Sequence, residues 1–137
     1  MSPNRIVWLN ISGSGNETAA HLAQNTPMTI MFCAFDGNPK ILRLFGDATV
    51  THPRDKTWQA LENLFEPHPC ARQYVDFRFD FLQTSCGFDV PFYDYKEERD
   101  NFPKWLAEKD SGAIKEYWGL KNQVSIEGLP THILDKE

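Results

Sequence analysis

The chain has 137 residues, of which 41% are hydrophobic and 13% aromatic, a composition typical of a folded globular protein rather than a disordered one. Its formal net charge of −5 argues against a nucleic-acid partner, because a phosphate backbone is bound through a basic surface. The sequence has neither an apolar run long enough for a membrane span nor a signal-peptide core at its start, so we expect a cytoplasmic protein with no membrane partner. Its three widely spaced cysteines suit free thiols in a reducing compartment.

The first predicted elements are a strand over residues 5–11 and a short helix over residues 16–24. Between them lies the glycine-rich stretch Ser-Gly-Ser-Gly of residues 12–15. Ser14 and Glu17 have the spacing of a capping box, in which each side chain would accept a hydrogen bond at the start of the helix. Free backbone N–H groups and the helix dipole at this point favour an anion such as a phosphate.

Two observations weaken the prediction of a phosphate site at this turn. No Lys or Arg occurs over residues 6–39, so dipoles and hydroxyl groups alone would have to hold the anion there. The carboxylate of Glu17 would also repel an anion. The alternative interpretation is a well-capped helix with no ligand.

The pattern of apolar and charged residues from residue 27 onward, together with the first strand, predicts a small antiparallel barrel. Residues 27–35 are apolar on both faces, as in a strand buried on both sides. Phe77, Phe79 and Phe81 alternate with charged residues, as in a half-buried strand. The remaining predicted elements are a strand over 41–51 with a bulge at Gly46, a helix over 55–65, a strand over 73–84, helices over 103–109 and 113–121, and a loosely held tail over 125–137. The predicted fold class is mainly β (α+β), with helices outside the barrel.

The order and spacing of several segments resemble the pyridoxamine 5'-phosphate oxidase-like family, the FMN-binding split barrels. One of these segments runs over residues 7–22 and contains Ser-Gly-Ser-Gly-Asn-Glu-Thr at residues 12–18. The similarity extends over nearly the whole chain, through residues 7–22, 28–35, 41–46, 83–91, 95–109 and 121–130.

This resemblance implies a single split antiparallel barrel over residues 1–137 that forms a homodimer, with FMN and a small-molecule substrate bound at the subunit interface. The flavin ring would supply the chemistry, so no catalytic residue is singled out. A metal site is not expected, since the sparse His68-Pro-Cys70 motif offers too few ligands. The residues expected to contact the cofactor are Asn10, Ser12, Ser14, Gly15, Asn16, Thr18, Arg43, Gln83 and Ser85.

The chain departs from the family pattern in two ways. It starts where the family's third strand is expected, so we expect it to be either a fragment or a natural short form without the first two strands, the second of which carries a lysine for the flavin phosphate in the family. Glu17 and Thr18 stand where the flavin oxidases place Arg and Lys. Two functions therefore stay open: an FMN-dependent oxidoreductase acting on an unknown small molecule, or a cofactor-free relative that serves as a dimeric binding module or catalyses a non-redox reaction. The residues by themselves favour an outward-facing side chain for Arg43 over a ligand contact, and a structural or inert role for Cys86.

Overall fold

The computed structural model describes residues 2–135, which form four strands and four helices around one antiparallel sheet. In chain order the elements are β1 (Arg5–Ile11), α1 (Glu17–Gln24), β2 (Pro27–Cys33), β3 (Ile41–Thr51), α2 (Trp58–Glu62), β4 (Ala71–Ser85), α3 (Asn101–Ala107) and α4 (Ser111–Lys121). Over residues 2–135, no helix combines the length and the apolar character needed to cross a membrane.

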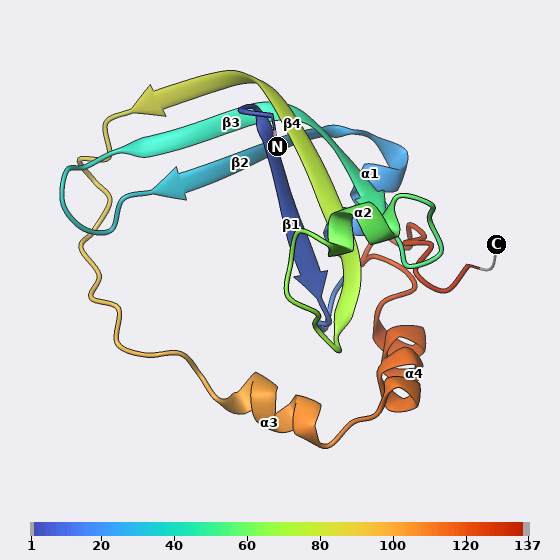
Figure 1. The fold of residues 1–137 in the computed structure, drawn as a ribbon. Helices are drawn as coiled ribbons and strands as arrows, with labels where there is room; N and C mark the ends of the chain where they lie inside the picture. Colours follow the sequence, from blue (N-terminus) through green and yellow to red (C-terminus); the bar gives the residue numbers. More distant parts are fainter. Residues whose placement is uncertain (1, 136–137) are drawn as a thin grey trace.

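The sheet has the strand order β1-β4-β3-β2, and all neighbouring strands are antiparallel. At 15 residues β4 is the longest strand, and it pairs with β1 along its first half and with β3 along nearly all of its length. The strands curl into a half-barrel, and the helices lie outside it (Figure 1). This arrangement confirms the predicted mainly β (α+β) fold class and is consistent with a split barrel.

The bend in the sheet lies at the predicted bulge. The register between β3 and β4 shifts between Phe45 and Gly46. A Cβ atom added at Gly46 would lie 2.0 Å from the carbonyl oxygen of Arg78 and 2.5 Å from the Cα atom of Phe79. Only glycine fits at this point, because the two backbones approach too closely for any side chain.

Two hydrophobic clusters hold the structure together. The first lies on one face of the sheet, where Leu44, Val75 and Phe77 pack with Leu22 of α1. The second joins α4 to the start of β4 and to the C-terminal segment, through Cys70, Ile114, Trp118 and Ile133. Burial of these side chains fixes where α1 and α4 lie against the sheet.

Several sequence expectations are wrong in detail. The helix expected over 55–65 is limited to α2, since the residues around it are turns and bends. The strand expected over 27–35 ends at Cys33 and is not buried on both faces: Met31 and Phe32 are about half exposed. The tail expected over 125–137 is ordered through residue 135, with a β-bridge between Val124 and Pro130. Residues 136 and 137 lie outside the described residues.

The far ends of β2, β3 and β4 extend beyond the helices as an apolar, exposed part of the sheet (Figure 1). Phe81 is 58% exposed and Leu82 50% exposed, and they point to opposite faces because they are adjacent in β4. From Ser85 the chain leaves the sheet in a long arc over residues 86–100, which contains no helix or strand, before it reaches α3 (Figure 1). The predicted half-burial of β4 therefore holds for Val75 and Phe77 but not for Phe81.

Candidate functional site

The loop between β1 and α1 is held in place by hydrogen bonds from α4 and its C-cap residue Asn122, whereas three backbone N–H groups of the loop have no partner among the described residues. The indole N–H of Trp118 donates to the hydroxyl of Ser12 over 2.7 Å. The side-chain amide of Asn122 donates to the carbonyl of Gly13 over 2.9 Å, and Asn16 donates to the carbonyl of Asn122 over 3.4 Å. Within residues 2–135, the backbone N–H groups of Gly13, Ser14 and Gly15 donate no hydrogen bond.

The predicted capping box does not form. Helix α1 begins at Glu17 with Asn16 as its N-cap, and Asn16 makes no side-chain capping bond. The carboxylate of Glu17 instead accepts a hydrogen bond from the backbone N–H of Ile126, over 3.0 Å. Ser14 is exposed. The first turn of α1 therefore keeps unsatisfied N–H donors.

A buried arginine lies under this loop. Arg72, near the start of β4, is only 3% exposed. Its guanidinium donates to the carbonyls of Gly13 and Gly15 over 3.4 and 2.9 Å, and to the side-chain oxygen of Asn10 over 3.2 Å. No carboxylate within residues 2–135 forms an ion pair with it, and its Nε atom has no hydrogen-bond partner. Burial lowers the pKa of Arg72 to about 10, which shows how costly its isolated charge is.

The loop lines two hollows. One, of about 290 Å³, lies over Arg72 and is bordered by Asn10, Gly15, Asn16, Glu17 and Thr18. The other, of about 250 Å³, has an aromatic wall and is bordered by Ser12, Gly13, Ser14, Phe102, Trp105 and Tyr117. Two residues that line the first hollow have a buried polar atom without a partner: Nε of Arg72 and the side-chain oxygen of Asn16. An anion with further polar groups would fit this set of donors and acceptors.

The other predicted site residues lie at the opposite end of the sheet. Arg43 of β3 is paired with Gln83 of β4, and its guanidinium donates to the hydroxyl of Ser85 over 3.0 Å. The glycine-rich loop follows Ile11, which is paired with Ala71. The 12 positions of β4 from Ala71 to Gln83 correspond to about 40 Å along an extended strand. One chain thus forms two separate groups of predicted site residues.

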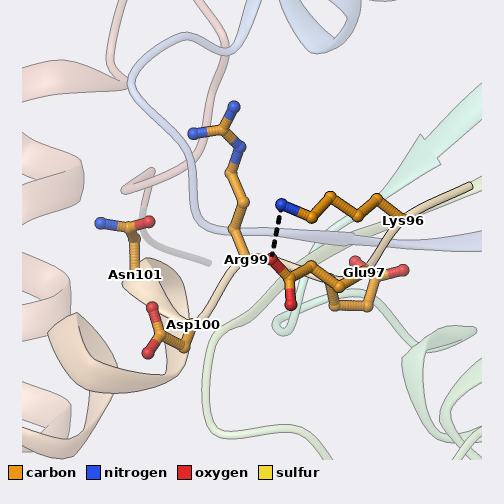
Figure 2. Close-up of a pocket in the computed structure, with 6 residues that line it drawn as sticks. Lys96, Glu97, Arg99, Asp100 and Asn101 are labelled. Carbon is orange, nitrogen blue, oxygen red and sulfur yellow. Dashed lines mark ion pairs between the residues drawn. The ribbon is translucent and has the colours of Figure 1, made fainter.

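A hollow of about 670 Å³ in the arc before α3 does not have the character of a site. It is bordered only by six consecutive residues, 96–101. Their side chains point in different directions (Figure 2), and the drawn ion pair joins the adjacent residues Lys96 and Glu97 over 3.8 Å. Exposed charges of one segment do not create a converging set of functional groups.

A chain of buried polar groups connects the arginine with the C-terminal segment. Asn10 donates to the side-chain oxygen of Gln73 over 3.1 Å, and the Gln73 amide lies 3.2 Å from Nε2 of His52. The same Nε2 atom lies 3.1 Å from the carbonyl of Thr131. Burial lowers the pKa of His52 below its ordinary value. The nearby charge of Arg54 lowers it further, while the Thr131 carbonyl and Asp55 raise it and His132 lowers it slightly.

Sequence reasoning missed Arg72, Trp118 and Asn122. The predicted strand began at residue 73 and so left out Arg72, although a charged residue beside a buried strand was a usable signal. Nothing local to Trp118 or Asn122 points to the loop, because they lie more than 100 residues after it in the chain. The three cysteines, Cys33, Cys70 and Cys86, are free, as predicted.

Comparison with known proteins gives one informative similarity. The chain is 32% identical, over 145 aligned positions, to the pyridoxamine 5'-phosphate oxidase family protein ustO of Aspergillus flavus. The alignment covers 95% of this chain and 58% of the relative, so the chain spans little more than half of the relative's length. No family model and no solved structure matches. This similarity and the curled antiparallel sheet together support a relation of the chain to the pyridoxamine 5'-phosphate oxidase family.

Proposed function

We propose that this protein binds FMN and is an oxidoreductase acting on a small molecule. The observation that carries the proposal is Arg72, a buried guanidinium without a carboxylate partner under a loop of free N–H donors. A phosphate over the loop would supply the negative charge that this guanidinium lacks. When bound, the flavin supplies the redox chemistry, and the residues of this chain supply placement and charge.

Arg72 also changes the balance of charges that the sequence suggested. The loop has no cation of its own over residues 6–39, but β4 brings one beneath it from the middle of the chain. Glu17 lines the same hollow, while one of its carboxylate oxygens is hydrogen-bonded to the backbone of Ile126. The site thus carries one buried positive charge and one negative charge at its border.

We further propose that a second copy of the chain completes the site. The group of Arg43, Gln83 and Ser85 lies far along β4 from the glycine-rich loop, so one chain does not present both groups to one ligand. Exposed apolar surface lies next to this group, because Phe81 is 58% exposed and shares a face of β4 with Gln83 and Ser85. A second chain that covered this surface would gain about 25 cal/mol of favourable free energy for each Å² of apolar surface removed from water.

Sedimentation of the wild type and of a Phe81→Lys variant tests the homodimer. We expect a dimer for the wild type at micromolar concentration and a monomer for the variant. The matched control is Leu120→Lys on α4, outside the sheet, at a residue that is 73% exposed. A wild-type monomer under these conditions would contradict the proposal of a shared site.

The alternative function is a cofactor-free binding module or a non-redox enzyme of the same fold. It is favoured by the carboxylate of Glu17 at the border of the hollow and by the absence of a lysine among the hollow's lining residues. FMN and riboflavin, which lacks the phosphate, distinguish the two functions when the quenching of their fluorescence is measured. We expect FMN to bind at least about tenfold more tightly, corresponding to about 1.4 kcal/mol from the phosphate. Failure of both flavins to bind would favour the alternative.

A further inference from the structure

A second cluster of chemically competent side chains lies between α1 and the C-terminal segment. Glu17 and His21 are four residues apart in α1, so they lie on the same face of the helix, one turn apart. Glu127 reaches the same place from the segment after α4, and its carboxylate lies 3.3 Å from Nε2 of His21. The imidazole nitrogen and the two carboxylates offer ligand atoms that all lie within 4.8 Å of one another.

The surrounding backbone holds the two carboxylates in place. Ile126 donates its N–H to Glu17 over 3.0 Å, and the hydroxyl of Ser125 donates to Glu127 over 2.8 Å. This hydrogen bond from Ser125 is the main reason why the pKa of Glu127 is lowered. The cluster is therefore assembled by α1 and the C-terminal segment together, and it does not exist in either part alone.

The charges of the cluster are not balanced by the protein. Within residues 2–135, neither Glu17 nor Glu127 forms an ion pair with a Lys or Arg side chain, and His21 is the one basic group beside them. Two carboxylates next to one imidazole carry an excess of negative charge, which a divalent cation would neutralise.

The types of the ligand atoms narrow the choice of cation. Mg²⁺ and Ca²⁺ prefer sites made of oxygen atoms alone, whereas an imidazole nitrogen combined with carboxylates suits zinc and neighbouring first-row metals. Such metals lie about 2.0–2.2 Å from their ligands, so rotation of these partly exposed side chains would have to draw the ligand atoms slightly closer. Three protein ligands leave a further coordination position for water.

We propose that Glu17, His21 and Glu127 bind one divalent first-row transition-metal ion, which fastens the C-terminal segment to α1. Glu17 also lines the hollow over Arg72, but metal binding by these three residues does not require a bound flavin. The C-terminal segment carries Thr131 and Ile133, both buried, and follows Asn122, which supports the glycine-rich loop. Metal binding is thus expected to stabilise the packing of residues 123–134.

Zinc is the probe for the test, with the full chain first treated with a chelator and then freed of it. Calorimetric titration is done in a Cys86→Ser background, because an exposed thiol binds zinc by itself. We expect one saturable zinc ion per chain, a rise in the unfolding temperature, and slower hydrogen exchange over residues 123–134. Mg²⁺ at the same concentration should produce none of these effects.

Two variants and one control locate the site. His21→Ala and, separately, Glu127→Gln should each weaken zinc binding by at least about tenfold, and circular dichroism should show that they are folded. The control is His132→Ala, which removes a comparably exposed histidine beside an acidic residue, Asp135. Zinc binding that is absent in the parent protein, or unchanged in both His21→Ala and Glu127→Gln, would overturn the proposal.

Discussion

Replacing Arg72 tests whether a buried guanidinium sustains anion binding at the glycine-rich loop. Arg72→Met removes the charge and keeps an apolar stem of similar length, whereas Arg72→Lys keeps the charge but loses the planar fork. An interaction with a charged group contributes about 1.5–3 kcal/mol, which corresponds to a loss of about 10- to 150-fold in FMN affinity for Arg72→Met. For Arg72→Lys we expect a smaller loss, since the positive charge stays under the loop.

The same change affects stability through two opposing effects. Arg72 donates three hydrogen bonds to the loop and to Asn10, each worth about 1 kcal/mol. Gly13 and Gly15 are exposed, so water can take over their carbonyls, and methionine also removes an isolated buried charge. We therefore expect Arg72→Met to reduce the free energy of unfolding by about 1–2 kcal/mol, which leaves a folded protein for the binding assay.

Titration of FMN fluorescence measures the affinity, and urea unfolding measures the stability of each variant. The control is Arg78→Met, which removes an exposed arginine from the same strand. Its FMN affinity should equal that of the wild type. If Arg72→Met is folded and binds FMN as tightly as Arg78→Met, the guanidinium has no part in anion binding and the reasoning is refuted.

Three further predictions concern the fold. Gly46→Ala should destabilise the protein by about 3 kcal/mol in urea unfolding, because its Cβ would lie 2.0 Å from the Arg78 carbonyl oxygen, whereas Gly13→Ala, with open space around it, should change stability little. Wild-type stability should fall as the pH is lowered from about 6.5 to 5, because the unfolded chain protonates His52 more readily than the folded chain does. His52→Gln should flatten this pH dependence, and an unchanged slope would show that other groups cause it. Trp118→Phe should cost about 1 kcal/mol through the lost indole hydrogen bond, and an unfolding midpoint equal to that of the wild type would contradict the role assigned to it.

The local pattern of the sequence was enough to predict most of the sheet. The strand over 5–11 has the predicted bounds, and the strand over 41–51 has its bulge at Gly46 as predicted. These features follow from side-chain alternation and from the steric freedom of glycine, which are properties of neighbouring residues. The loop at residues 12–15 was identified for the same reason, since glycines between a strand and a helix are visible in the sequence.

The ends of several elements and the chemistry of the loop depended on distant contacts. The capping box failed because Glu17 hydrogen-bonds to Ile126 instead of closing the helix start, a competition that its neighbours do not reveal. A loose tail was expected for the C-terminal segment, but this segment is packed. The reason is that Thr131 and Ile133 are buried against elements that come much earlier in the sequence.

The sequence by itself determined the family resemblance, the antiparallel strands and the position of the glycine-rich loop, since each depends on the order and spacing of nearby residues. Tertiary structure alone decided that Arg72 lies under that loop and that Arg43 lies far from it. Both positions are set by the pairing of β1 with the first half of β4 and by the pairing of Arg43 with Gln83 near the other end of β4. The register between strands brings charges together or separates them, and a short stretch of sequence does not encode it.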